Sequence, residues 1–149
     1  MPWDFSLHTR PSQYLICHVV VAQVAACRNL EQVSLTWCES LTAISALSHC
    51  SKLKVCDLHH CVSLVSVEPL SSLQELVDLN LSHCKLISDI SALSGCSKLA
   101  VLKLVGCRKI QDLSSLKSCR LLGKLDISFC LNARGAGLLG QIGQIIQAQ

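Results

Sequence analysis

The sequence predicts a single right-handed solenoid of mixed α/β class, in which short parallel strands alternate with tight helical returns. Three observations predict this fold. Apolar residues recur with a period of 23 and no insertion, as in Leu30, Leu53, Leu76, Leu99 and Leu122. Within each period, they lie first two and then three positions apart, and ten of the eleven cysteines fall into phase with the repeat. A fixed period of roughly 20–50 residues is typical of repeat architectures.

The first half of each period predicts a short strand. Apolar and other residues alternate at its centre, as in LEQVSL (30–35) and LVDLNL (76–81). A period of two places alternate side chains on opposite faces of a strand. Successive coils are therefore expected to stack their strands about 4.8 Å apart into one parallel sheet.

The second half of each period predicts a 3₁₀ or similarly tight helical return. In LTAISALSHC (41–50) the buried-type residues are three apart, which matches the three residues per turn of a 3₁₀-helix. Asp89, Ser91 and Ser94 are expected to cap such a return by bonding to nearby backbone groups.

The two ends depart from the repeat. We expect an N-terminal segment over 1–29, five repeats over 30–144, and the end of a helical tail over 145–149. Residues 14–27 predict a helical cap over the first coil, and the tail helix is expected to begin near 135. Its apolar stripe would be Leu138, Leu139, Ile142, Ile145 and Ile146. Solenoid ends need caps, so the tail either covers the last coil or docks on a partner or on further repeats.

The cysteines predict buried, reduced thiols that act as small apolar residues. Their number is odd and their spacing serves the repeat, which favours a reducing compartment such as the cytosol over a secreted disulfide framework. The ladder cysteines are expected to donate weakly to turn carbonyls. The apolar run 14–26 is too short to span a bilayer, and Asp4 precedes it, so a signal peptide is the less favoured alternative.

The repeat L-x-x-L-x-L-x-x-C resembles that of leucine-rich-repeat proteins whose repeats carry cysteine in place of the inner asparagine. The segments SALSHCSKL (45–53) and SALSGCSKL (91–99) differ at one position, and their pattern is most similar to the repeats of kinetoplastid proteins. The resemblance covers about residues 19–145. It implies an arch with a concave sheet face that binds proteins and a convex face of helical returns.

Strand residues that alternate with the buried leucines are expected to point to the concave face. One further row, next to the cysteine ladder, holds Trp37, His60, His83, Gly106 and Phe129. Exposed Trp and Phe are typical interface anchors, although Trp37 and Phe129 could instead tuck against neighbouring turns. The candidate partner-binding residues are Trp37, Asp57, His59, His60, Asp78, Asn80, His83, Lys103, Lys124 and Phe129.

The predicted function is that of a non-catalytic protein-interaction module, a scaffold or assembly subunit that binds a protein partner. The expected location is the cytoplasm, with a cytoskeletal or flagellar assembly as one setting. The mixed Asp and Lys columns and the low charged fraction of 15% favour such a role. One alternative is the substrate-recognition component of a ubiquitin ligase with a separate catalytic subunit. Another is an extracellular or membrane-anchored recognition domain.

Other functions are not expected. The net charge of +3 comes without a dense cationic run, which disfavours nucleic acid. A zinc site formed by histidines with Cys61 and Cys84 is disfavoured because the ladder thiols should face the core. Asp57, Ser82 and either His59 or His83 could mimic a catalytic triad, but no nucleophile elbow accompanies them. We therefore expect no enzyme activity, metal, cofactor, membrane or small-molecule substrate.

Overall fold

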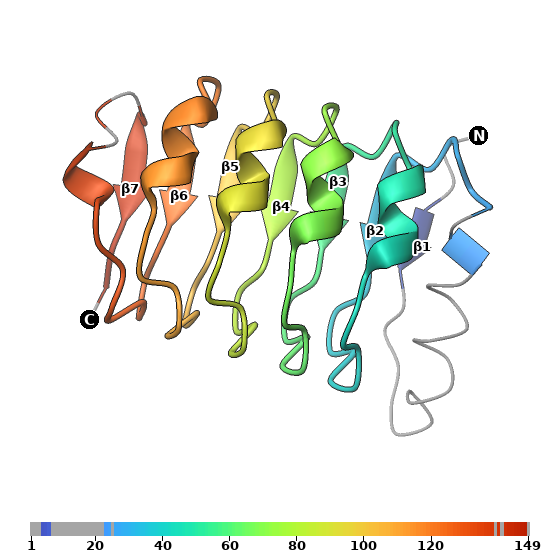
Figure 1. Cartoon of the computed structure of the whole chain (residues 1–149), viewed down its shortest axis with the longest axis horizontal. Helices are drawn as coiled ribbons and strands as arrows, with labels where there is room; N and C mark the ends of the chain where they lie inside the picture. The colour runs from blue at the N-terminus through green and yellow to red at the C-terminus, as the bar shows by residue number, and fades with distance from the viewer. Residues whose placement is uncertain (1–3, 7–22, 25, 139, 141, 149) are drawn as a thin grey trace.

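The strands form one parallel seven-stranded sheet whose order follows the chain from β1 to β7 (Figure 1). The computed structural model describes residues 4–6, 23–24, 26–138, 140 and 142–148. The strands are β1 (Asp4–Ser6), β2 (Gln32–Ser34), β3 (Val55–Asp57), β4 (Asp78–Asn80), β5 (Val101–Lys103), β6 (Lys124–Asp126) and β7 (Gln144–Ile146). The predicted solenoid is confirmed.

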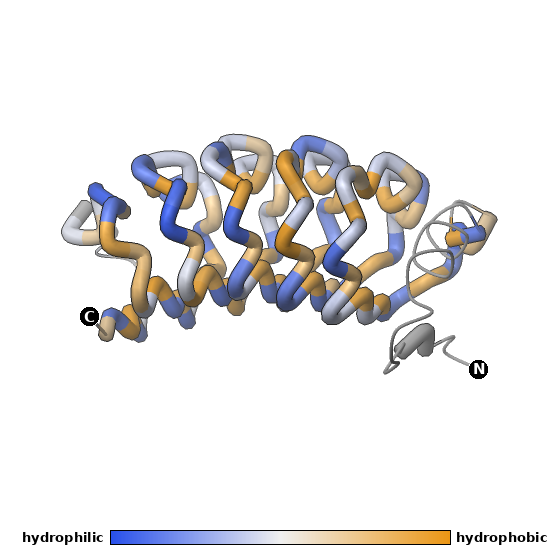
Figure 2. The backbone as a smooth tube through the Cα atoms, turned by 90° about the horizontal axis from the view of Figure 1, so that it is seen from below, coloured by the Kyte–Doolittle hydropathy of each residue, from blue (hydrophilic) through white to orange (hydrophobic). Residues whose placement is uncertain are grey.

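Five 3₁₀-helices form the second wall, parallel to the sheet and opposite it (Figure 2). They are η1 (Ser45–His49), η2 (Glu68–Ser72), η3 (Ser91–Gly95), η4 (Ser114–Ser118) and η5 (Ala136–Leu138). The three-residue spacing predicted these returns correctly. Local capping is also confirmed at Asp89, whose Oδ1 accepts a 2.7 Å hydrogen bond from the Ser91 amide.

The register of the sheet follows the repeat. The central residues of neighbouring strands face one another, so Val33 pairs with Cys56 and Cys56 pairs with Leu79. These central residues are buried and their neighbours on each strand are more exposed. A slip of one residue would turn the buried set toward solvent. The 23-residue period therefore fixes which side chains reach the outer face of the sheet.

The core between the two walls is aliphatic and lined with sulfur. Leu47, Leu70, Leu93 and Leu116, one from each of η1 to η4, are fully buried. They pack in one continuous cluster with the strand leucines and the ladder cysteines. Burial of one such side chain stabilises the fold by roughly 1.5–3 kcal/mol. Trp37 and Phe129 do not belong to this cluster.

Buried thiols join each coil to the one before it. The Sγ atoms of Cys61, Cys84, Cys107 and Cys130 donate to carbonyl oxygens 26 residues earlier, at 2.8–3.2 Å. Cys84, for example, donates to the Leu58 carbonyl, which also accepts the amide of Cys61. The thiol thus occupies the second acceptor site of a turn carbonyl. The predicted bond from ladder cysteines to turn carbonyls is confirmed.

A second thiol ladder runs behind the 3₁₀ wall. Cys50, Cys96 and Cys119 donate to the carbonyls of Val24, Leu70 and Leu93, again 26 residues back, at 3.3–3.5 Å. Leu73 occupies the phase of this ladder in the coil between Cys50 and Cys96. The second ladder is therefore interrupted at η2, whereas the first continues through every coil from Cys61 onward.

Burial also makes these thiols poor nucleophiles. Loss of hydration raises the pKa of Cys61, Cys84 and Cys96 to about 12, because the thiolate would be charged in an apolar interior. The groups therefore stay protonated at neutral pH and keep the hydrogen that they donate. Nine described cysteines are free, but Cys38 is disulfide-bonded. The expectation that every thiol is reduced is wrong at Cys38.

Both ends differ from the expected helices. β1 adds a strand before the repeats and pairs with β2, whereas the expected cap over 14–27 lies mostly outside the described residues. At the other end, the predicted tail helix is wrong. Residues 144–146 form β7, which pairs with β6 through Lys124–Gln144, a spacing of 20 instead of 23. Backbone pairing with β6 makes this segment a strand, although its burial does not alternate: Gln144 and Ile145 are exposed and Ile146 is half-buried. The tail thus covers the last coil as a shortened repeat.

We predict that Cys84→Ala lowers the free energy of unfolding by about 1–2 kcal/mol. The substitution removes one buried hydrogen bond and buried side-chain volume. Cys27→Ala is the matched control, because the Cys27 thiol is partly exposed and bonds to Gln23 within its own turn at 3.8 Å. Urea denaturation followed by circular dichroism measures both. Equal stability losses in the two variants would contradict the bridging role of the ladder.

We also predict that Gly95→Ala destabilises the stack by about 1–3 kcal/mol, the usual range for overpacking. A Cβ at Gly95 in η3 would clash with the backbone carbonyl of Ser71 in η2. Gly137→Ala is the control, because no heavy atom lies within 4 Å of a Cβ placed there. Thermal unfolding compares the two; a Gly95→Ala variant as stable as Gly137→Ala would show that the coils can separate without cost.

Candidate functional site

The outer face of the sheet, opposite the η helices, carries five of the predicted site residues. We call it the sheet face. Asp57, Asn80 and Lys103 align in one row across β3, β4 and β5. Asp78 and Lys124 lie in the row two positions earlier, with Val101 between them. All five side chains are partly exposed. The structure therefore brings these residues together on one surface, as the alternation predicted.

Two of these residues also hold the turns that follow their strands. Oδ1 of Asp57 accepts a 3.0 Å hydrogen bond from the His59 amide, and Oδ1 of Asn80 accepts one from the Ser82 amide at the same distance. Asp126 repeats the contact with the Ser128 amide. Local bonds of this kind are typical of Asx turns. Asp57 and Asn80 therefore stabilise the turns with one side-chain oxygen and could contact a partner with their remaining polar atoms. No described residue bonds to the Asp78 carboxylate.

The residues in the row next to the cysteine ladder share an unusual backbone. Trp37, His60, His83 and Phe129 have φ angles of 60–62°, and Gly106 has φ 69°. This left-handed region is uncommon for bulky residues. The backbone reverses at this point to leave the sheet, so the side chains turn outward along one edge. We call this set the turn row. Sequence reasoning placed these residues in one row but did not foresee the conformation, although a glycine in phase with them signals it.

Rings of the turn row stack along the edge. Trp37 stacks on His60 with centroids 3.8 Å apart and planes inclined by 19°, and His60 lies 4.5 Å from His83. His59 approaches the same stack, because its Nε2 lies 2.9 Å from Nδ1 of His60. Trp37 remains 49% exposed and Phe129 45% exposed. Trp37 thus both contacts a neighbouring turn and presents a ring to solvent.

The histidines of this stack are held in the neutral state. Partial loss of hydration, followed by repulsion from His59 and from Lys85, lowers the pKa of both His60 and His83 from the ordinary value of 6.5. A neutral ring can donate one hydrogen bond and accept another, as the close contact between His59 and His60 requires. At neutral pH the turn row therefore presents an uncharged ring surface.

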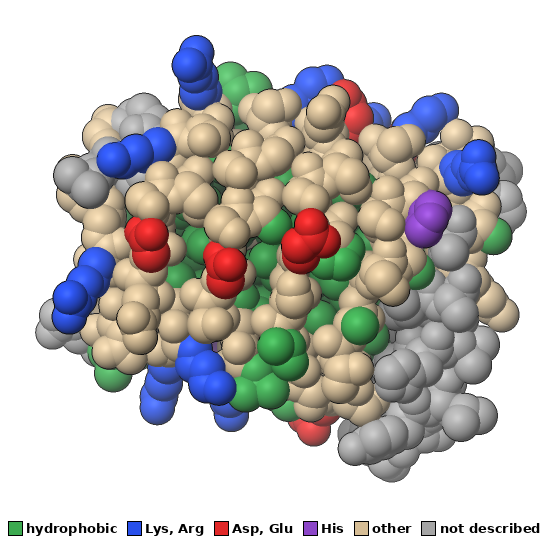
Figure 3. Space-filling view, viewed as in Figure 1, with side chains coloured by type: hydrophobic (Ala, Val, Ile, Leu, Met, Phe, Trp, Pro, Cys, Tyr) green, Lys and Arg blue, Asp and Glu red, His purple; other side chains and the backbone are tan. Residues whose placement is uncertain are grey.

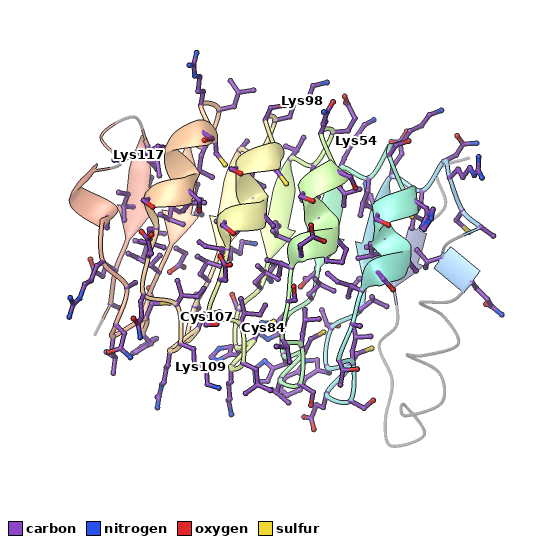
Figure 4. The ribbon with its side chains drawn as sticks, in the orientation of Figure 1. Lys54, Cys84, Lys98, Cys107, Lys109 and Lys117 are labelled. Atoms are coloured by element: carbon purple, nitrogen blue, oxygen red, sulfur yellow. The ribbon has the colours of Figure 1, made fainter. Side chains whose placement is uncertain are left out.

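The sequence reasoning missed three cations beside the turn row. Lys85, Arg108 and Lys109 line an open hollow of about 450 Å³ together with His83, Gly106 and Phe129. Figure 4 shows Lys109 projecting from the edge where Cys84 and Cys107 mark the turns. The three cations follow the cysteine ladder in consecutive coils, at one or two positions after Cys84 and Cys107.

The described residues show no other candidate for chemistry. Among them, no group of three or more His, Cys, Asp or Glu is arranged to hold a metal ion. No helix in the described ranges is long and apolar enough to cross a bilayer. Of the residues that could mimic a triad, Ser82 is buried and Asp57 accepts a hydrogen bond from the backbone amide of His59.

Comparisons with known proteins place the fold. No protein-family model matches the chain, and no curated protein sequence matches it. An internalin of Listeria monocytogenes, inlF, is similar over 70% of this chain at 28% identity, with a TM-score of 0.62. Internalin C2 of the same organism is similar over 87% of this chain at 22% identity, with a TM-score of 0.72. The fold is a leucine-rich-repeat solenoid.

The leucine-rich-repeat solenoid described here is shorter than those structures. It spans 30% of the inlF chain and 56% of the internalin C2 chain. Internalins are leucine-rich-repeat proteins, so the expected leucine-rich-repeat fold and the placement of strands and 3₁₀ returns are confirmed, while the resemblance to kinetoplastid repeats stays a prediction. The likeness concerns the repeat architecture, which many unrelated functions share.

We predict that the ring protons of His60 and His83 titrate below pH 6.5 in NMR spectra. As the pH falls, a histidine in the unfolded chain takes up a proton before His60 and His83 do in the folded chain. Their contribution to the free energy of unfolding is therefore fully present above about pH 6.5 and is lost as the pH drops below it. The paired variant His60→Asn/His83→Asn keeps a residue that tolerates positive φ. It should lose less stability between about pH 7.5 and pH 5.5. Midpoints at or above 6.5 would contradict the desolvated stack.

Proposed function

We propose that this leucine-rich-repeat solenoid is a non-catalytic interaction module that binds a protein partner through the sheet face and the adjoining turn row. One observation carries the proposal. Polar and ring side chains from successive coils converge on one surface, while the residues that alternate with them fill the core. Solenoids use such extended surfaces for binding.

The charges of the sheet face favour a protein over a phosphate backbone. Asp57 on β3 and Asp78 on β4 are acidic, Lys103 on β5 is basic, and β6 carries both Lys124 and Asp126. Both signs are present across the face, which favours a partner with charges of both signs. A nucleic acid would meet three carboxylates among these five charged side chains. Leucine-rich-repeat proteins of the internalin kind are interaction modules, which supports the same role.

The turn row supplies the apolar part of the proposed interface. Trp37 and Phe129 are large, half-exposed rings at opposite ends of the row. Aromatic side chains that become buried on binding contribute disproportionately to affinity. The interface we propose therefore combines ring anchors at the edge with charged groups across the strands. The nine free cysteines favour an assembly subunit in the cytoplasm, whereas the disulfide at Cys38 favours the extracellular alternative.

We predict that Trp37→Asn/Asp78→Lys abolishes capture of the main protein partner from native lysate, measured by quantitative mass spectrometry. Asparagine is chosen at position 37 because it tolerates the positive φ found there. The carboxylate of Asp78 bonds to no described residue, so its replacement should leave the fold intact. Removal of one anchor and reversal of one charge should reduce partner recovery at least tenfold, equivalent to about 1.4 kcal/mol.

Glu68→Lys provides the matched control. Glu68 is exposed at the start of η2, on the opposite wall, and its replacement makes the same change in net charge. The control should capture the partner as wild type does, with thermal unfolding verifying all three proteins. Equal loss in the sheet-face variant and in Glu68→Lys would contradict the assignment of the surface, and so would an unchanged set of captured proteins in both.

A further inference from the structure

The ring stack of the turn row is interrupted at one coil. Trp37, His60 and His83 follow one another with centroid separations of 3.8 and 4.5 Å. The next member is Gly106, which has no side chain, and the one after that is Phe129. The interruption leaves the open hollow of about 450 Å³ between His83 and Phe129. This volume lies within the range of roughly 300–1,000 Å³ that ligand sites occupy.

The missing side chain at Gly106 lets the His83 ring lean over the glycine backbone. A Cβ on Gly106 would lie 2.9 Å from Nδ1 of His83, and Gly106 itself is buried. The hollow therefore opens beside the leaning His83 ring, with Phe129 as its second ring wall. A ring that entered the hollow could contact both aromatic walls, an arrangement that aromatic pairs favour.

The rim of the hollow is cationic. Lys85, Arg108 and Lys109 line it and are exposed. The ion pairs formed among described residues, Lys54 with Glu31 and Lys98 with Glu75, do not involve them. Figure 3 shows Lys and Arg side chains along both the upper and the lower edges of the molecule, and the turns after the strands lie at the lower edge. Three cations that lack a described counter-charge favour carboxylates close to the inserted ring.

We propose that the hollow at Gly106 binds an aromatic side chain of a protein partner that is flanked by acidic residues. The ring of the partner enters the hollow and lies between His83 and Phe129. The carboxylates of the partner pair with Lys85, Arg108 and Lys109. This inference rests on the proposed function and adds to it the chemistry of one partner segment. Docking would also cover Phe129, which is 45% exposed in the free chain.

The probe is a fluorescein-labelled acidic peptide of sequence EDDYDDE, and the readout is fluorescence anisotropy with the full chain. EDDLDDE keeps the charge and replaces the ring. The tyrosine peptide should bind roughly three- to tenfold more tightly, the gain expected for an added ring contact. Equal affinity of the two peptides would overturn the proposal. Tighter binding of an oligothymidylate of equal length would also overturn it, because phosphate attraction would then dominate.

Variants of the chain locate the contact. Phe129→Asn keeps a residue compatible with positive φ and should remove the preference for tyrosine. Lys109→Glu should weaken binding at least fivefold relative to Lys117→Glu, which makes the same charge change on η4. Thermal unfolding verifies that each variant folds. Equal effects of the two lysine variants, or an unaltered tyrosine preference in Phe129→Asn, would overturn the proposal.

One variant separates this proposal from the proposed function. Asp78→Lys lies on the sheet face and not on the rim of the hollow, so it should leave the preference for tyrosine intact. A chain that still captures its partner through the sheet face, but does not distinguish the two peptides, would overturn the hollow site and leave the proposed function standing. Loss of peptide discrimination in Asp78→Lys as well would overturn the assignment to the hollow.

Discussion

The buried bond from a ladder thiol to the turn carbonyl of the preceding coil is the contact on which this structure depends. Each coil buries its apolar residues only against its neighbours, so the coils must stay in register at every step. The turn after each strand leaves a carbonyl inside the stack that accepts the amide three residues later and has a second acceptor site directed at the next coil. A cysteine every 23 residues places a donor against that carbonyl in every coil from Cys61 to Cys130. The high pKa of the buried thiols preserves this donor.

The same turns create the functional edge. To bring the cysteine back into the core, the preceding residue adopts a positive φ and its side chain is directed away from the core. Four of the five positions hold Trp, His, His and Phe, although glycine accepts this backbone at lower cost. Strain of this kind is often found at functional sites. The ring stack and the hollow beside Gly106 therefore both follow from the positive φ that the cysteine ladder imposes on the preceding residue.

Much of the fold could be predicted from the sequence because the repeat is strict. Apolar residues two positions apart predicted β2 to β6, and apolar residues three positions apart predicted the 3₁₀ wall. The alternation along the strands placed Asp78 and Lys103 on the outer face of the sheet. The ends were less predictable. β1 pairs with β2 at a spacing of 28, and β7 pairs with β6 at a spacing of 20, so neither keeps the period. In the tail, Ile142, Ile145 and Ile146 fit a helical stripe as well as a strand, and pairing with β6 decides between them.

The candidate site was predictable in membership but not in geometry. Phase alone grouped Trp37, His60, His83 and Phe129, but whether rings stack depends on side-chain torsions that no sequence period encodes. Nor did phase reveal that Asp57 and Asn80 bond to the turns. A binding role for Lys85, Arg108 and Lys109 could not be predicted, because it depends on the hollow beside Gly106, which only the structure shows.

Hydrogen–deuterium exchange of the chain, with and without its captured partner, tests the central claim most directly. The account predicts added protection at β3 to β6 and at the turns after them, with η1 to η4 unchanged. Protection confined to the η wall would contradict it.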